Sequence, residues 1–244
     1  MRVESFAIHL RPRTDMEAAD LGVRLCQSVA RDVYRCYAAV FVPVAALTLA
    51  TYEIASWLPG ILLWWAKPWL DRTILFALSR AAFGQGTTPR DVWRAQRHVW
   101  WAQFLRTWTL RRLSPWRSFT QPVYQLEGLS GSALRKRVLQ IRSGRTGSAL
   151  LMTSAFSTTE LALSVGLISL AVWFAPHGYE PDLVQTFLRA EESAIDFVMA
   201  VVFAAVVLFL EPLYVAAGFG MYLNRRVDLE AWDIEQEFRR AFAQ

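Results

Sequence analysis

Long runs without charge are the feature that most constrains the fold of this chain of 244 residues. A helix that spans a bilayer needs roughly 20 mostly uncharged residues, whereas a helix in a soluble core seldom excludes charge over that length. Two segments meet this requirement outright, 37–58 and 148–175, and a third, 194–223, is broken at Glu211 and Pro212 before it resumes. A fourth, 58–83, is apolar on both sides of Lys67, Pro68, Asp71 and Arg72. We therefore expect an all-α, polytopic bundle of about four transmembrane helices in two pairs, with the second helix interrupted.

The positions of the basic residues support this topology. Of 26 Lys and Arg, 25 fall in 1–36, 67–147 and 224–244, none falls in 53–66, and only Arg189 falls in 175–192. Short cytoplasmic loops keep Lys and Arg, whereas exported loops lack them. The first 36 residues also hold five acidic groups and no apolar core, unlike a secretory signal. The pattern predicts a multi-pass protein with both termini in the cytoplasm; the alternative is a soluble protein with buried helices.

The segment 14–36 has the pattern of an amphipathic helix. Thr14 and Glu17 have the spacing of a capping box, which predicts a helix start. Leu21 and Leu25 then fall on one face and Arg24 on another. The helix either lies along the inner membrane surface or packs on cytoplasmic parts of its own chain.

The segment 84–147 is a basic cytoplasmic stretch. Residues 67–147 hold fifteen basic and three acidic groups, and the positive-inside bias already explains this net positive charge. Without a helix-turn-helix, an RNA-binding signature or a zinc finger, nucleic acid is not an expected partner. Thr88-Pro89 predicts an interfacial helix over 89–112, and its aromatic face is formed by Trp93, Trp100, Phe104 and Trp108. The alternative is an aromatic stripe packed on other helices. Prolines and glycines predict loops through 113–133 and 142–148.

Several ionisable residues fall inside the predicted membrane segments. They are Lys67, Asp71, Arg72, Glu160, Asp196 and Glu211. Each costs about 2.5–3.5 kcal/mol or more in hydrocarbon, so each asks for a partner or a purpose. Glu160 and Glu211 either form an ion or proton path, or pair with Lys67 and Arg72 and fix the helix register. We favour pairing, because no internal repeat typical of transporters is visible.

The C-terminal segment 224–244 is predicted to leave the membrane as a charged helix. One face carries Tyr222, Arg226, Glu230, Asp233 and Glu237. This face is either a docking surface for a partner or a solvated surface.

The sequence offers no pattern for chemistry. Cys26 and Cys36 are too few for a disulfide framework, and the three histidines are scattered. No nucleophile stands beside a recognisable base, and no metal-ligand spacing appears. We expect no catalytic residue, no metal and no cofactor, and a protein that is not an enzyme.

Short motifs along most of the chain carry a resemblance. They are Arg11-Pro12-Arg13-Thr14, Asp20-Leu21-Gly22, Lys67-Pro68, Leu78-Ser79-Arg80, Phe83-Gly84, Leu113-Ser114-Pro115-Trp116-Arg117-Ser118-Phe119, Pro122-Val123-Tyr124-Gln125-Leu126-Glu127-Gly128, Glu211-Pro212-Leu213-Tyr214, Asn224-Arg225-Arg226 and Glu230-Ala231-Trp232-Asp233. In these motifs the chain resembles bacterial inner-membrane proteins encoded beside MoxR-type AAA ATPases, von Willebrand factor A-like proteins and transglutaminase-like membrane proteins. The spacing of Tyr222, Arg226, Glu230 and Asp233 is also similar to the membrane domain found with glycerophosphoryl diester phosphodiesterases.

The resemblance implies a cellular location and partner proteins, but no chemical activity. It implies the bacterial inner membrane, and an assembly in which an ATPase acts on cytoplasmic or membrane partners. We therefore expect a non-catalytic scaffold or adaptor subunit in contact with the lipid bilayer. The alternative is a transporter or channel-like component that uses Glu160 and Glu211. The sequence does not specify the oligomeric state.

Overall fold

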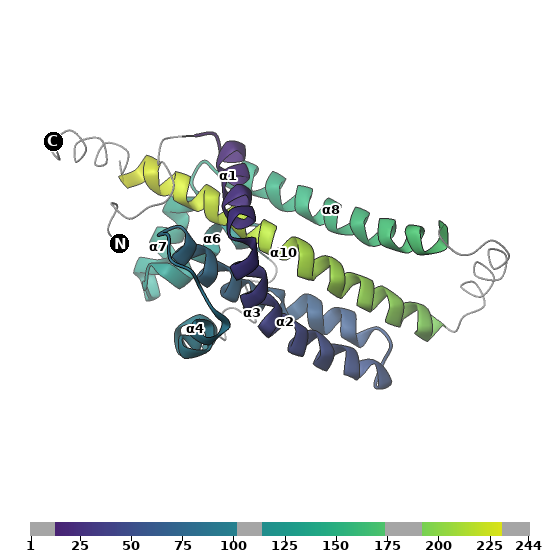
Figure 1. Ribbon diagram of the computed structural model, residues 1–244. Coiled ribbons are helices and arrows are strands. Elements are labelled where there is room, and N and C mark those ends of the chain that lie inside the picture. The colour runs from purple at the N-terminus through teal and green to yellow at the C-terminus, as the bar shows by residue number, and fades with distance from the viewer. Residues whose placement is uncertain (1–12, 102–113, 174–191, 231–244) are drawn as a thin grey trace.

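The computed structural model describes residues 13–101, 114–173 and 192–230, and all regular secondary structure in these ranges is helical (Figure 1). The elements are α1 Asp15–Ser28, α2 Ala30–Ala50, η2 Thr51–Glu53, α3 Leu58–Ala81, α4 Pro89–Arg94, η3 Arg97–Trp101, α6 Arg117–Leu126, α7 Gly131–Arg142, α8 Thr146–Trp173 and α10 Glu192–Glu230. The expectation of an all-α fold is confirmed.

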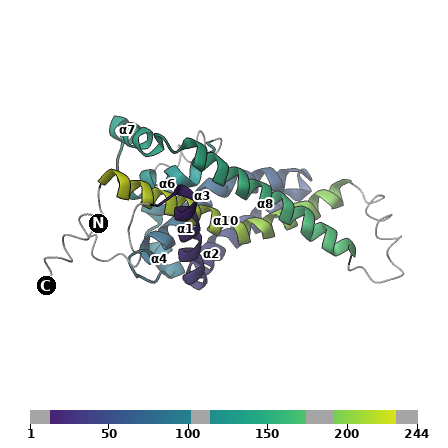
Figure 2. The ribbon, with the colours of Figure 1, turned by 90° about the horizontal axis from the view of Figure 1, so that it is seen from above.

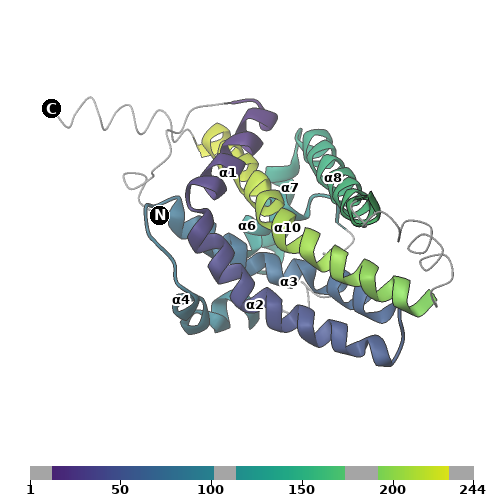
Figure 3. The same cartoon turned by 45° about the vertical axis from the view of Figure 1, so that its right-hand side comes forward.

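The helices form a bundle with two distinct ends. The long helices α2, α3, α8 and α10 extend together toward one end, while α1, α6 and α7 gather at the other around the last turns of α10 (Figures 1 and 3). Seen from above, α8 crosses α10 at an angle, and α7 lies at the end where α8 begins (Figure 2). At the end formed by the long helices, large apolar side chains are exposed, among them Leu47, Ile54, Trp57, Leu161 and Trp173.

Among the described residues, three helices are long and apolar enough to cross a membrane. Their spans are Ala30–Glu53, Thr146–Leu170 and Asp196–Glu230. The predicted second crossing, 58–83, corresponds to α3, which is not one of the three. It is nonetheless a single continuous helix that contains Pro68, and it lies beside α2.

Two helices begin at the residues that the sequence indicates. Thr14 precedes α1, and its side chain accepts a hydrogen bond from the Glu17 amide at 3.4 Å. Thr88 precedes α4 and forms a complete capping box with Asp91. These bonds satisfy amide groups that a helix N-terminus otherwise leaves without a partner.

The predicted surface helix 14–36 ends earlier than expected. The structure breaks it at Val29, so α1 ends at Ser28 and the membrane-span candidate α2 begins at Ala30. The Ser28 hydroxyl donates to the Leu25 carbonyl at 2.8 Å, a local bond that competes with continued helix. The predicted helix 89–112 is also divided, because α4 ends at Arg94 and a π-helical turn, η3, begins at Arg97. Its remainder, 102–112, lies outside the described residues.

The prediction of loops through 113–133 is wrong. Most of this stretch is helical, in α6 and the start of α7, and Pro122 lies buried inside α6. Backbone contact with α10 holds α6 in place, because a Cβ atom on Gly218 would lie 2.5 Å from Ser118. The turn between α6 and α7 uses Gly128 and Gly131, whose φ angles of 64° and 58° disfavour other residues. Of the second predicted loop, 142–148, the structure shows a turn at Ser143–Arg145 and then the start of α8.

The first helix crosses the last one at very close range (Figures 1 and 3). A Cβ atom on Gly22 would lie 2.0 Å from the Ala216 carbonyl oxygen, and one on Gly220 would lie 2.2 Å from the Ala18 carbonyl oxygen. Small residues four apart on both helices, Ala18 and Gly22 in α1 and Ala216 and Gly220 in α10, therefore let the two backbones touch. This crossing fixes α1 against the bundle.

Candidate functional site

Five charged side chains from four helices meet inside the bundle, and we call them the charge cluster. They are Lys67 and Asp71 of α3, Arg117 of α6, Glu160 of α8 and Glu211 of α10. The Lys67 ammonium lies 2.7 Å from both the Glu160 and the Glu211 carboxylates. The Arg117 guanidinium lies 2.5 Å from Glu211 and 3.0 Å from Asp71. Glu211 therefore lies between two cations.

Local sequence explains how the five groups converge. Lys67 and Asp71 are one helical turn apart, so they share a face of α3. Arg117 is the first residue of α6, and the tight contact of α6 with α10 at Gly218 brings it to Glu211. Its guanidinium also lies over the Tyr214 ring, 5.4 Å from the ring centre.

Burial makes these contacts essential. Asp71 is fully buried, and Glu211, Lys67 and Arg117 are 2%, 5% and 6% exposed. Removing one partner from a buried ion pair leaves an uncompensated charge, which costs about 3–5 kcal/mol. Although burial alone lowers the pKa of Arg117, the carboxylates of Asp71 and Glu211 raise it above its ordinary value, so the guanidinium stays charged.

Glu160 differs from the other members because its side chain is 23% exposed. It lines a polar cavity of about 230 Å³ together with Lys67, Arg117 and Glu211. We call this cavity the cluster pocket. Its other walls come from α3, α8, α10 and the residues just before α6, namely Trp64, Thr153, Phe156, Ser157, Leu210, Tyr214, Ser114 and Pro115.

The other two charged residues predicted to fall inside membrane segments, Arg72 and Asp196, lie apart from the charge cluster. Arg72 points elsewhere and donates from Nε to the Val99 carbonyl oxygen. Asp196 accepts a hydrogen bond of 2.5 Å from the Ser56 hydroxyl, which joins α10 to the turn before α3. The structure thus brings Lys67 to both predicted glutamates but does not bring Arg72 to them.

Sequence reasoning missed Arg117 as a cluster member. It lies among fifteen basic residues of 67–147, where the positive-inside bias accounts for every cation equally well. The one distinguishing signal is its place between Pro115 and Pro122, a stretch interpreted as loop. Only the tertiary contact with α10 identifies it.

The predicted C-terminal face is engaged within the chain over its described part. Tyr222 is buried and donates to Glu127 at 2.8 Å, and Arg226 lies 2.5 Å from Glu230. Arg137 of α7 bonds both Glu127, at 2.8 Å, and Glu230. These groups join α7 to α10. The other two predicted members of this face, Asp233 and Glu237, lie outside the described residues.

The predicted aromatic face is divided between interior and surface. Trp100 is 7% exposed, and its indole N–H donates to the Thr73 hydroxyl at 3.0 Å. Trp93 is 63% exposed, with its ring packed edge-on against Trp100. Phe104 and Trp108 lie outside the described residues.

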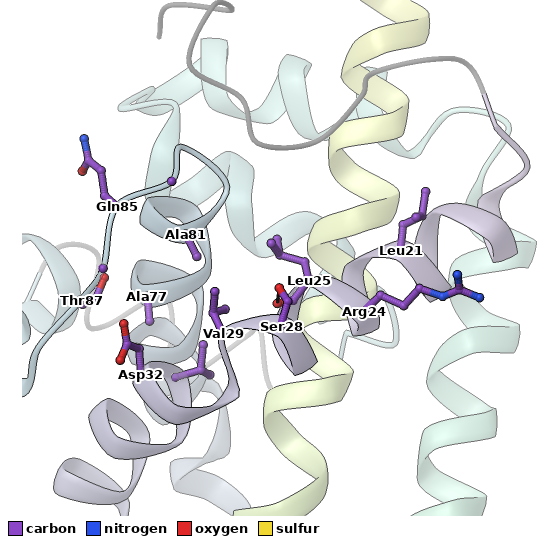
Figure 4. Close-up of a pocket in the computed structure, with 13 residues that line it drawn as sticks. Leu21, Arg24, Leu25, Ser28, Val29, Asp32, Ala77, Ala81, Gln85 and Thr87 are labelled. Carbon is purple, nitrogen blue, oxygen red and sulfur yellow. Dashed lines mark hydrogen bonds between the residues drawn. The ribbon is translucent and has the colours of Figure 1, made fainter.

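A larger cavity of about 460 Å³ lies between α1, α2 and the C-terminal end of α3, away from the end where large apolar side chains are exposed (Figure 4). Its walls are mainly apolar, from Leu25, Val29 and Ala77. Asp32 and Thr87 lie at one end of the cavity, as Figure 4 shows. This arrangement places one carboxylate beside an apolar surface.

Within the described ranges, no group of three or more His, Cys, Asp and Glu residues is placed to hold a metal ion. Both cysteines in these ranges are free thiols and buried. Comparison of the chain with family models, with curated proteins and with solved structures found no match.

Proposed function

We propose that this chain is a non-catalytic integral membrane protein that acts as a scaffold or adaptor subunit of a membrane assembly. The observation that carries the proposal is the outer face of α8, which we define as Leu151, Ser154, Thr158, Ala162, Val165 and Ser169. All six are exposed, and 6% of the apolar stretch of this span is buried, against 50% for α10. A membrane helix with so little of its surface covered by its own chain is open to a partner.

The composition of this face favours a helix over lipid as its neighbour. Four of its six residues are Ser, Thr or Ala, and their spacing of three and four repeats along one side of the helix. Small residues let two helix backbones approach closely in a membrane, where packing drives association. By contrast, the exposed side of α2 carries the large apolar residues Val42 and Leu47, which suit lipid.

The proposed topology has four crossings, through α2, α3, α8 and α10, in a bacterial inner membrane with both termini in the cytoplasm. Four crossings return the chain to the side where it started, as the distribution of Lys and Arg requires. The apolar first turns of α3 would meet lipid. Lys67 and Asp71 further along the same helix have partners in the charge cluster, which offsets their cost in the membrane.

The resemblance in the sequence motifs supports an AAA ATPase of the MoxR type as a cytoplasmic partner of such an assembly. Exposed Arg135 and Lys136 on α7, together with the exposed arginines of α4, offer a basic cytoplasmic surface for it. Attraction between such a surface and an acidic partner weakens with salt.

Site-specific photo-crosslinking in the native membrane tests the proposal. A crosslinker at Ala162 should give a discrete protein adduct, whereas one at Leu47 on the lipid-facing side of α2 should give none. The bulky substitution Ala162→Phe should abolish recovery of that partner from mild detergent, and Leu47→Phe should leave it unchanged. Identical crosslinking patterns at the two positions would show that α8 meets only lipid and would refute the proposal.

A second candidate function is a transporter or channel-like component. The cluster pocket favours it, because a polar cavity beside Glu160 is a feature that ion or solute paths require. Glu211, however, already forms ion pairs with both Lys67 and Arg117. Flux assays on reconstituted protein with Glu160→Gln and Glu211→Gln would distinguish this candidate, since an adaptor shows no flux in any variant.

A further inference from the structure

Asp71 is the most deeply buried member of the charge cluster. Its side chain is fully buried, and within the described residues no N–H or O–H group donates a hydrogen bond to either of its carboxyl oxygens. The Nε atom of Arg117 lies 3.0 Å from Oδ2 without forming a hydrogen bond to it. An ionised carboxylate at this position would have lost its water without gaining the donors that replace water, which is strongly unfavourable.

The other two acidic groups of the cluster do have donors. Glu211 accepts a hydrogen bond of 2.5 Å from Nη2 of Arg117, and the Lys67 ammonium lies 2.7 Å from its other oxygen. Glu160 accepts a hydrogen bond of 2.7 Å from Lys67, and its side chain is 23% exposed, so that water reaches it as well. Both glutamates are therefore suited to the ionised form, and a proton held by the cluster belongs on Asp71.

Asp71 and Glu211 are also in direct contact. A hydrogen bond joins their side chains, one carboxyl group to the other. Two ionised carboxylates have no hydrogen to share and repel each other, so this bond requires that one of the two groups is protonated. Asp71 is then the donor and Glu211 the acceptor.

The formal charges agree with this assignment. With all five members ionised, the cluster would carry two positive and three negative charges. One proton on Asp71 brings the sum to zero, which is the least costly arrangement in a low-dielectric interior. Tyr37 of α2 and Tyr214 of α10 also face the cluster, as neutral phenols. Arg72, the next cation along α3, donates instead to the Val99 carbonyl oxygen.

We propose that Asp71 is a proton-binding site, which retains its proton at neutral pH and donates it in a hydrogen bond to Glu211. This bond joins α3 to α10 inside the bundle. When the proton leaves, two buried carboxylates face each other and the cluster has one negative charge in excess. The stabilisation that the proton gives is therefore present at neutral pH and is lost as the pH rises. The site does not depend on the adaptor role, because neither group belongs to the outer face of α8.

Infrared spectroscopy of the full-length chain in lipid bilayers detects the proton directly. A protonated carboxylic acid has a carbonyl band that an ionised carboxylate lacks, and carbon-13 labelling of aspartate shifts this band. We expect the band in the wild type at neutral pH, and its loss in Asp71→Asn. The matched control is Asp196→Asn, which should retain the band, because Asp196 already accepts a hydrogen bond from the Ser56 hydroxyl.

Thermal unfolding gives a second, independent test. Asparagine resembles a protonated aspartate, because its amide N–H can donate to Glu211 as the carboxyl O–H does. Asp71→Asn should therefore change Tm at neutral pH by less than about 3 °C. Glu211→Gln removes the anion between Lys67 and Arg117 and should lower Tm by roughly 10 °C. In increasingly alkaline buffer, the Tm of the wild type should fall relative to that of Asp71→Asn.

Three results would overturn the inference. One is a wild-type spectrum at neutral pH without the band of a protonated aspartate, a measurement that needs no variant. Another is a band that persists in Asp71→Asn, which would place the proton on a different residue. The third is an Asp71→Asn variant that loses as much stability as Glu211→Gln, the result expected if Asp71 were an ionised partner of Arg117.

Discussion

The contact between Gly22 of α1 and Ala216 of α10 allows a quantitative prediction for Gly22→Ala. The added Cβ atom would lie 2.0 Å from the Ala216 carbonyl oxygen. To restore an ordinary contact near 3.4 Å, α1 would have to move about 1.4 Å away from α10. A gap of about 0.5–1 Å between packed atoms already loses a quarter to a half of their dispersion attraction. Overpacking of this kind costs about 1–3 kcal/mol, and the better helix propensity of Ala returns about 1 kcal/mol.

We therefore expect Gly22→Ala to lower the free energy of unfolding by up to about 2 kcal/mol, which at about 2–4 °C per kcal/mol is up to several degrees in Tm. Cys26 lies one helical turn further along α1 and is fully buried, so its reaction with a thiol dye reports the release of this helix. Burial raises the pKa of the Cys26 thiol to about 12, which keeps it unreactive in the folded state at neutral pH.

Gly166→Ala in α8 is the matched control, because nothing lies within 4 Å of its added Cβ atom. This variant has the propensity gain without the steric cost, so its Tm should stay level or rise. If Gly22→Ala raises Tm as much as Gly166→Ala does, the close crossing of α1 and α10 is not a determinant of stability, and the reasoning fails.

Two further predictions concern charged groups. Lys67→Met should lower the free energy of unfolding by about 3–5 kcal/mol, because Glu211 loses one of its buried partners. The control Lys136→Met, on the exposed side of α7, should have no measurable effect. Size-exclusion profiles and unfolding curves that are the same for the two variants would contradict this prediction. Hydrogen bonds from the Thr88 backbone and side chain hold the pKa of Asp91 below its ordinary 3.8, so the stabilisation they give α4 is present above that pH and is lost as the pH falls through the lowered value. In carbon-13 spectra of labelled aspartate the pKa of Asp91 should return toward 3.8 in Thr88→Ala, and an unchanged titration would refute the capping role.

The apolar segments were predictable because a membrane-spanning helix needs a minimum length and few charges, and both can be counted directly in the sequence. The described spans of α8 and α10 begin within a few residues of the predicted segments. Helix caps were predictable for the same reason, since Thr88 and Asp91 act over three residues. Both signals depend on local neighbours alone.

Features that depend on tertiary contact were not predictable. The helix α6 runs through Pro122 because its backbone packs on α10 at Gly218, a residue 96 positions away. Lys67 pairs with both glutamates, as expected from charge alone, but Arg72 was an equally good candidate on that ground and does not pair with them. The rotation of α3 against its neighbours decides which cation faces Glu211, and this rotation cannot be predicted from hydropathy.

The length of α10 has a mechanical consequence. It is one helix of 39 residues, roughly 58 Å at 1.5 Å per residue, and no linker interrupts it between its apolar turns and the turns that hold α7 through Tyr222 and Arg137. Lys67 and Arg117 clamp it at Glu211, directly before Pro212, which makes that point a fulcrum. In the proposed membrane topology, a change in the tilt of one part of α10 is therefore transmitted to the other part, so that bilayer thickness would be coupled to the orientation of α7.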